Sequence, residues 1–442
     1  MTTWPERVAA LGLSEHAAAL AARHFNEVAT HHAKLIGTSA APRAWWIPGR
    51  IEVLGKHTDY GGGRSLLCAV ERGFHVMASA RDDSVVRIVD ASTNANITIP
   101  MDRDAMSTPG RWTDYPITVV RRIARDFPGA RTGMNAVIRS SLPSAAGLSS
   151  SSAMVIATFL PLAALNELRA HPEWAAIRSE DALGEYLGAM ENGKAYGEFA
   201  ADRGVGTQGG SEDQTAILRS RPGHLLQYHF IPVTYEDTVP LPPGWQFVIG
   251  MSGVHAAKAG AVQARYNALA QQVASLLAVW NKRTGRDDRS LFGALQSDPD
   301  ATRRLAAMIA ADSSLDESLQ ARLAQFTDET DVIIPEVTRR LRAGDVPAIG
   351  ELIARSQAGA EAALRNQIPE TIHLAHRATE LGAAAASAFG AGFGGSVWAL
   401  VRTDDVAQFT AQWQDDYLAR FPARRHRAEF FASRPGPAAC EV

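Results

Sequence analysis

The chain has 442 residues, of which 46% are hydrophobic and 21% charged, an ordinary balance for a globular protein. It is too long for one ordinary hydrophobic core, so we expect two domains. Its formal net charge of −3 gives no broad basic field, which argues against nucleic acid or an anionic membrane as the main partner.

In the first half of the chain, apolar periodicity predicts one or two amphipathic helices within residues 6–36. A strand is predicted to begin at Ala44, and Pro48 and Gly49 predict a turn after it. Further strands are predicted at residues 51–54, 73–80, 85–89, 97–99 and 134–138, and helices at about 112–126, 150–167 and 182–199. Strands that come first in the sequence, followed by helices, indicate an α+β domain rather than a regular βαβ repeat.

In the second half, a proline cluster at residues 240–243 marks the expected joint between the domains, which we place between residues 238 and 239. Beyond it we expect a strand at residues 247–251 and alanine-rich helices at about 258–279 and 290–377. A glycine-rich turn followed by a strand is expected within residues 386–401.

The two cysteines, Cys68 and Cys440, lie far apart and without a metal-ligand spacing. This excludes a disulfide scaffold and is typical of a reducing compartment. The N-terminus lacks the pattern of a signal peptide, and the longest apolar stretch, about 13 residues, is too short to span a bilayer. We therefore expect a cytoplasmic protein.

The segment from Leu142 to Ala153 reads L-P-S-A-A-G-L-S-S-S-S-A and lies between two apolar runs. Small residues at the start of a helix let the backbone approach a ligand, and the first-turn N–H groups favour negative charge. Ser149, Ser150 and Ser151 add hydroxyls for phosphate oxygens or a divalent metal. The pattern predicts a polyphosphate site, although it is not a Walker motif. A flexible connector is the alternative interpretation.

Residues 48–63 place Arg50, Lys56, His57 and Asp59 beside three consecutive glycines. Short polar side chains on a sharply turning backbone can bind vicinal hydroxyls, because carboxylates accept hydrogen bonds and imidazole either donates or accepts. The segment therefore predicts a pocket for a polyol, and a solvated β-turn is the alternative.

Asp213 follows a glycine-rich approach, and residues 389–397 form a second glycine-rich segment, F-G-A-G-F-G-G-S-V. An aspartate held against a turn near a cation can orient a hydroxyl and accept its proton. A helix N-cap is the alternative for Asp213. The glycines of the second segment either bring backbone close to a ligand or form a simple hairpin.

Together the four segments resemble the GHMP kinases, and within them the galactokinases. Residues 50–63 are similar to the sugar-binding signature G-R-x-N-x-I-G-E-H-T-D-Y-N-x-G, residues 143–153 to the ATP-binding motif P-x-G-x-G-L-S-S-S-A-A, and residues 390–395 to the closing G-x-G-x-G-G loop. Residues 212–214 stand where the family has M-D-Q. Residues 252–258 and 265–267 resemble its S-N-V-K-H and Y-N-x-R-R segment.

The resemblance implies a two-domain GHMP kinase fold of the α+β class with the active site in the cleft between the domains. Residues 1–238 would form an N-terminal α+β domain like domain 2 of ribosomal protein S5, and residues 239–442 a C-terminal α+β domain. The implied activity is ATP-dependent phosphorylation of the anomeric hydroxyl of a monosaccharide, which is galactose or a related hexose or hexuronic acid. ATP and Mg²⁺ would be the cofactors.

By the same resemblance, Asp213 would be the catalytic carboxylate and Arg50 the cation that keeps it ionised. Ser151 and Glu191 would bind Mg²⁺. Glu198 is the alternative to Glu191, because the spacing from Glu191 to Asp213 is longer than the family's. The sugar would be bound by Lys56, His57, Asp59, Gly210 and Tyr266, and ATP by Pro143, Ala145, Gly147, Leu148, Ser149, Ser150, Ser151, Gly392 and Gly394.

The departures from the family pattern bear on the substrate. Lys56 replaces the glutamate that serves the C6 end of the sugar in galactokinases, so one hypothesis is a hexuronic acid whose carboxylate meets Lys56. The alternative is that Lys56 points to solvent or pairs with Glu52 or Glu71, which leaves galactose as the substrate. Glu212 replaces the methionine before Asp213, and we expect its carboxylate to face outward into solvent. The alternative is that both carboxylates face inward, where Glu212 would raise the pKa of Asp213.

Two other departures concern Glu52, which replaces the asparagine of the signature, and Ala145, which replaces the first glycine of the phosphate motif. Ala145 is tolerable there if its φ is negative.

Two other functions compete with a sugar kinase. A kinase for a non-sugar alcohol such as mevalonate or homoserine is disfavoured by the H-T-D-Y segment, which suits a polyol. A sugar- and ATP-binding sensor without turnover is disfavoured because residues 149–153, Arg50 and Asp213 are intact. The expected partners are the sugar and ATP, without nucleic acid or membrane, and we expect a monomer or homodimer.

Overall fold

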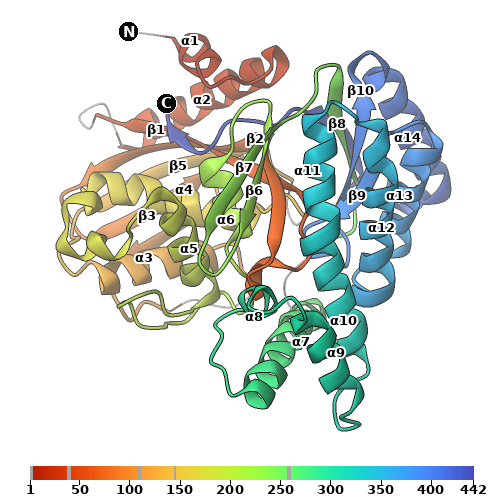
Figure 1. Cartoon of the computed structure of the whole chain (residues 1–442). Coiled ribbons are helices and arrows are strands. Elements are labelled where there is room, and N and C mark those ends of the chain that lie inside the picture. Colours follow the sequence, from red (N-terminus) through yellow and green to blue (C-terminus); the bar gives the residue numbers. More distant parts are fainter. Residues whose placement is uncertain (1–2, 37–40, 107–110, 144–145, 256–259) are drawn as a thin grey trace.

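The computed structural model describes residues 3–36, 41–106, 111–143, 146–255 and 260–442, and within them two β-sheets are flanked by helices (Figure 1). The larger sheet has the strand order β12-β1-β2-β5-β3-β4, with β6 and β7 continuing from β2. The smaller sheet has the order β11-β8-β10-β9. This mixture of sheets and separate helical layers confirms the α+β class.

The larger sheet consists of β1 (Arg43–Leu54), β2 (Arg64–Arg81), β3 (Val85–Asp90), β4 (Asn96–Pro100), β5 (Gly133–Ser140), β6 (His224–His229), β7 (Thr234–Pro240) and β12 (Cys440–Glu441). The smaller sheet consists of β8 (Trp245–Met251), β9 (Ala385–Phe389), β10 (Ser396–Arg402) and β11 (Glu429–Ser433). Because β12 pairs with β1, the chain ends on the larger sheet. The proposed domain division after residue 238 falls inside β7 and stays a prediction.

Helices from the first half of the chain cover both faces of the larger sheet: α1 (Trp4–Ala9), α2 (Glu15–Ile36), α3 (Asp114–Asp126), α4 (Ser150–Leu165), α5 (Glu180–Asn192) and α6 (Glu212–Arg219). Successive side chains of a strand point to opposite faces. Trp46 packs in a cluster with residues of α2, whereas the neighbouring Trp45 packs in the main core with residues of α4. The two helices therefore lie on opposite faces, which explains why β1 is buried almost throughout.

The second half is mostly helical, as expected, but it is divided into separate helices: α7 (Gly260–Thr284), α8 (Leu291–Gln296), α9 (Ala301–Ala310), α10 (Ser318–Thr327), α11 (Ile334–Arg342), α12 (Gly350–Gly359), α13 (Pro369–Glu380) and α14 (Val406–Arg420). A π-helical turn, η4 (Asp328–Ile333), joins α10 to α11. None of the helices among the described residues combines the length and apolarity that a membrane span requires.

Two predicted boundaries are wrong for local reasons. Pro48 and Gly49 do not turn the chain, because β1 continues through them with a register shift against β2. A side chain at Gly49 would place its Cβ 2.6 Å from the carbonyl oxygen of Leu148, so this glycine lets β1 pass close to the start of α4. The helix predicted to reach residue 199 ends at Asn192, because Gly193 follows in the left-handed conformation.

Candidate active site

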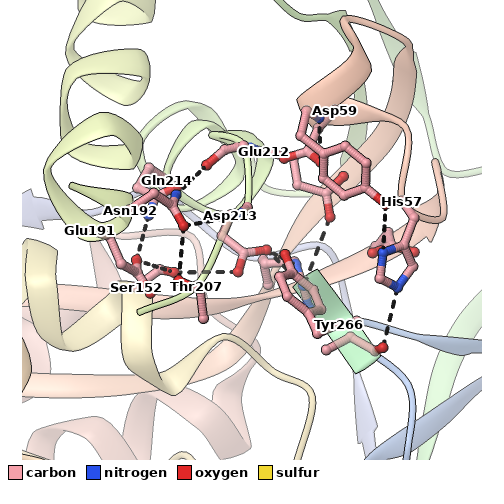
Figure 2. A pocket seen from close by; sticks show the side chains of 17 residues that line it. His57, Asp59, Ser152, Glu191, Asn192, Thr207, Glu212, Asp213, Gln214 and Tyr266 are labelled. Atoms are coloured by element: carbon pink, nitrogen blue, oxygen red, sulfur yellow. Dashed lines mark hydrogen bonds and ion pairs between the residues drawn. The ribbon is translucent and has the colours of Figure 1, made fainter. Parts of the chain in front are cut away.

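An open pocket lies where β1, α4, α5, α6 and α7 meet the loop after β9 (Figure 2). It is lined by Arg50, Glu52, His57, Asp59, Tyr60, Ser152, Glu191, Asn192, Thr207, Gly209, Gly210, Glu212, Asp213, Gln214, Tyr266, Gly390 and Ala391. Segments separated by more than three hundred residues in sequence therefore contribute to one site.

Arg50 connects the carboxylate of Asp213 to the start of α4. Its Nε and Nη2 each lie 2.7 Å from Oδ1 of Asp213, and its Nη1 donates to the carbonyl oxygen of Gly147 at 2.6 Å. Burial alone would lower the pKa of Arg50, but the nearby carboxylates of Asp213, Glu52 and Glu212 raise it. The guanidinium therefore stays charged.

Asp213 lies in the first turn of α6, where the helix dipole favours a negative charge. The N-cap position is occupied by Ser211, so the alternative interpretation of Asp213 as a helix cap is wrong. Its neighbour Gln214 also lines the pocket. The start of α6 thus presents polar side chains to the pocket while Ala216 and Ile217 are buried.

A serine that the sequence analysis did not single out links Asp213 to Glu191. The hydroxyl of Ser152 lies 2.8 Å from Oε2 of Glu191 and 3.3 Å from Oδ2 of Asp213, and Nε2 of Gln214 donates to the same Glu191 oxygen at 2.6 Å. Figure 2 shows Ser152, Glu191 and Gln214 gathered beside Asp213. The run of serines indicated this region, but the residue at which α4 begins determines which serine side chain faces Asp213.

Glu191 is the better placed of the two candidate metal carboxylates, because it lines the pocket and Glu198 is exposed outside it. The described residues contain no cluster of three or more His, Cys, Asp or Glu that could hold a metal alone. Magnesium in phosphoryl-transfer sites is commonly held by one or two carboxylates together with substrate phosphates. Glu191 and a neighbouring serine hydroxyl fit that requirement.

The predicted ATP-binding residues lie around the start of α4, with Ala145 outside the described residues. Leu148 is buried and Pro143 is half-buried, and Ser149, with a φ of 55°, precedes the helix that Ser150 begins. Ser151, the predicted metal ligand, hydrogen-bonds Tyr115 of α3. The sequence pattern did not indicate Tyr115 as a site residue, because an aromatic residue at the start of a helix usually belongs to the core.

The closing glycine loop packs directly against this helix start. A Cβ added to Gly390 would lie 2.9 Å from the carbonyl oxygen of Gly147, and Ser396 donates to the carbonyl of Ala146 at 2.5 Å. Gly392 and Gly394 have φ values of 77° and 139°, which side-chain-bearing residues rarely adopt. The loop is therefore more than a hairpin, because it packs against residues 146–147 just before α4.

The predicted sugar-binding residues His57, Asp59, Gly210 and Tyr266 lie together at the other end of the pocket. Nδ1 of His57 lies 3.0 Å from the hydroxyl of Tyr60, and its ring centroid is 5.4 Å from that of Tyr266. A side chain at Gly210 would collide with Oδ2 of Asp59. Burial, and then the charge of Asp213, raise the pKa of Asp59.

Lys56 does not line this pocket, contrary to its expected role in sugar binding. Its side chain is buried, and Nζ donates to Oγ of Ser356 at 2.9 Å. Ser356 in turn donates to Glu329, which also accepts hydrogen bonds from the backbone N–H groups of Gly55 and Lys56. The ammonium is thus turned toward the helices of the second half, and its position gives no support to a hexuronic acid substrate.

The carboxylates of Glu52 and Glu212 lie inside the protein, so the expectation that Glu212 faces solvent is wrong. Their residues are 2% and 8% exposed, and both line the pocket. Alternation along β1 places Glu52 on the same face as Arg50, toward α6. Burial raises the pKa of both carboxyl groups.

Family comparisons agree with this arrangement. The galactokinase galactose-binding signature matches residues 30–80, the GHMP kinases N terminal domain matches residues 114–194, and the GHMP kinases C terminal domain matches residues 333–419. The first covers Arg50 and residues 56–63, and the second covers the start of α4 and Glu191.

Individual relatives are galactokinases. That of Chloroflexus aggregans is 27% identical over 379 residues, covering 84% of this chain and 87% of its own. That of Roseiflexus sp. is 29% identical over 363 residues, covering 82% and 84%.

Among solved structures, Lactococcus lactis galactokinase complexed with galactose matches with a TM-score of 0.78 at 21% identity over 96% of this chain and all of its own. L. major mevalonate kinase in complex with R-mevalonate matches with a TM-score of 0.53 at 14% identity, covering 91% of this chain and 98% of its own. At these identities the structural matches establish the fold alone.

Proposed function

We propose that the chain is an ATP-dependent sugar kinase of the GHMP kinase superfamily and that its acceptor is the anomeric hydroxyl of galactose or a close relative. The observation that carries this proposal is the position of the Arg50–Asp213 pair. It lies between the cluster of His57, Asp59 and Tyr266 and the first turn of α4.

In the proposed reaction, the sugar lies against His57, Asp59 and Tyr266 with its anomeric hydroxyl facing Asp213. Arg50 keeps Asp213 ionised, so the carboxylate can orient the hydroxyl and accept its proton. The sugar oxygen forms a bond to the γ-phosphorus of ATP while the bond from that phosphorus to the bridging oxygen breaks, and ADP leaves. Placement and electrostatics supply most of the rate acceleration in such a transfer.

The phosphates of ATP would lie at the first turn of α4, where backbone N–H groups and the helix dipole favour anions. Mg²⁺ would be held by Glu191 with the hydroxyl of Ser152 or Ser151, and it would neutralise charge on the phosphates. Gly147 and Gly390 let the closing loop pack closely beside this site, because a Cβ on Gly390 would lie 2.9 Å from the carbonyl oxygen of Gly147.

Sugar-dependent release of ADP tests this proposal directly. We expect galactose to stimulate ADP formation by the wild-type protein, and Asp213→Asn to lower kcat by at least about a thousandfold with galactose binding retained. Galactose binding without ADP formation would identify a sensor instead. Stimulation by mevalonate or homoserine but not by any sugar would identify a kinase for a non-sugar alcohol.

A further inference from the structure

The sugar pocket contains two buried glutamates at positions where the galactokinase pattern has uncharged residues. Glu52 stands in place of asparagine and Glu212 in place of methionine. Both line the pocket, and both are almost completely inaccessible to solvent. Two acidic groups in place of neutral ones change the charge that a bound sugar meets.

The two glutamates interact with each other. A hydrogen bond joins their carboxyl groups, which requires that one of them carries a proton. Glu212 also accepts a hydrogen bond from Oγ of Ser65 at 2.8 Å, and its Oε1 lies 3.9 Å from Nη2 of Arg50. The pair therefore shares at least one proton.

Glu52 has an accepting atom that the described protein leaves without a partner. Its Oε1 is buried and receives no hydrogen bond from any described residue. A buried carboxyl oxygen without a donor is costly, because burial removes the water that would otherwise bind it. This unsatisfied acceptor makes a positive charge or a hydrogen-bond donor close to the pair favourable.

The single guanidinium of Arg50 is shared among the carboxyl groups of Asp213, Glu52 and Glu212. Arg50 is the one lysine or arginine among the described lining residues, and its guanidinium is bound to Asp213 and Gly147. The ammonium of Lys56 is bound to Ser356 outside the lining, and that of Lys194 donates to the carbonyl oxygen of Gly209 at 2.7 Å.

Asp59 adds a further carboxylate to the sugar end of the pocket, where His57 is hydrogen-bonded to Tyr60 and to the carbonyl of Ala391. A sugar therefore meets more acidic than basic groups.

We propose that the Glu52–Glu212 pair makes this pocket select its acceptor by charge, so that an amino sugar is preferred to the neutral sugar and a hexuronic acid is rejected. An ammonium group offers three hydrogen-bond donors and a positive charge to these carboxyl groups. A uronate would bury an additional carboxylate among carboxylates without an available cation. The proposal rests on the proposed sugar-kinase function and names the substrate class of the same pocket.

A matched set of sugars tests the proposal. Galactose, 6-amino-6-deoxygalactose and galacturonic acid share one ring configuration and differ in charge at C6, and galactosamine places the ammonium at C2 instead. Binding of each sugar to the full chain is measured by calorimetry without nucleotide, at a pH where the amines are protonated. We expect at least one amino sugar to bind about tenfold more tightly than galactose, and galacturonic acid to bind at least about tenfold more weakly.

The pair itself is tested by Glu52→Gln combined with Glu212→Gln, which keeps the side-chain volumes and removes the charge. The double variant should bring the affinities for the amino sugar, galactose and galacturonic acid within about threefold of one another. Glu198→Gln, which removes an exposed carboxylate outside the pocket, should leave the wild-type order unchanged. Thermal unfolding establishes that each variant is folded, and Glu52→Asn, which restores the family residue, replaces any variant that is not.

The proposal is overturned if galacturonic acid binds as tightly as galactose, if neither amino sugar binds more tightly than galactose, or if the double variant keeps the wild-type order. Parallel assays of ADP formation separate the two levels of inference. The predicted binding order without ADP formation from any sugar would overturn the kinase function while supporting charge selection. Turnover of galactose without the predicted binding order would support the kinase function and overturn charge selection.

Discussion

The guanidinium of Arg50 binds Asp213 through two nitrogens, Nε and Nη2, each of which lies 2.7 Å from the same carboxylate oxygen. A third nitrogen donates to the carbonyl oxygen of Gly147. One side chain on β1 thus fixes the distance between the start of α6 and the start of α4. This geometry depends on the planar, forked shape of the guanidinium, which a lysine ammonium does not reproduce.

Arg50→Lys should therefore lower kcat by about a hundredfold or more, even though the positive charge is kept. The KM for the sugar should change much less, because Arg50 contacts Asp213 and Gly147 rather than the predicted sugar-binding residues. Steady-state kinetics with both substrates measures the effect. Arg43→Lys is a matched control, because Arg43 lies on the same strand and pairs with Glu441 at the surface. A kcat near the wild-type value for Arg50→Lys would remove this residue from the reaction.

Ser152→Ala should reduce kcat about tenfold and raise the Mg²⁺ concentration required for half-maximal activity. The hydroxyl lies within hydrogen-bonding distance of both Glu191 and Asp213, so its loss leaves both carboxylates less well oriented. A magnesium titration at saturating ATP measures the change. Thr158→Val on the same helix removes a hydroxyl that bonds only to the backbone of Met154, and it should alter neither quantity. An unchanged magnesium requirement in Ser152→Ala would contradict the placement of the metal beside Glu191.

Lys56→Met should destabilise the protein without changing which sugar it prefers. Lys56 is buried against Ser356 and close to the buried Glu329, so removing its charge costs about 2–4 kcal/mol in the free energy of unfolding. Urea unfolding measures the loss, and Lys34→Met, at an exposed position on α2, should cost little. A changed ratio of kcat/KM values for galacturonic acid and galactose in Lys56→Met would show that the ammonium reaches the sugar after all.

Acid should lower the free energy of unfolding, because a buried histidine beneath α2 resists protonation in the folded state. Burial, and then the charges of His24 and Arg139, lower the pKa of His75 to about 3, and its Nε2 has no partner among the described residues. An unfolded histidine takes up a proton near pH 6.5, so the unfolded state binds more protons between about pH 6.5 and pH 3. Stability is therefore lost as the pH falls through that window, by up to about 1.4 kcal/mol per pH unit.

Urea unfolding at pH 7 and pH 5 measures this loss in the wild type and in His75→Phe. The variant cannot titrate at this position, so its stability should fall less between the two pH values, even if it is less stable at pH 7. An equal loss in both proteins would show that other groups cause the acid sensitivity.

Local pattern was enough to predict the elements whose apolar residues repeat clearly, such as α2, β5 and α4. It failed for β6 and β7, which carry many polar residues, and for the two-residue β12, whose pairing with β1 joins positions at opposite ends of the chain. Strands of this kind form because a partner is already in place, and a partner distant in sequence leaves no local trace.

The sequence pattern also predicted which chemical groups the site contains. Glycines, serines and the cluster around Arg50 and Asp59 indicated a polyol and a polyphosphate, and the structure brings His57, Asp59, Gly210, Asp213, Glu191 and Tyr266 into one pocket. Their roles in sugar, ATP and metal binding stay predictions. The sequence did not distinguish Ser152 from its neighbouring serines, since that choice depends on the residue at which α4 begins.

By itself, the sequence determined which functional groups the protein possesses and the backbone freedom that surrounds them. Only the tertiary structure decided where two charged groups point. The ammonium of Lys56 donates to Ser356, which lies 300 residues away in sequence, and Glu52 is hydrogen-bonded to Glu212 on α6. The direction of a side chain is set by the burial and hydrogen bonds that distant segments provide, and those exist only once the chain has folded.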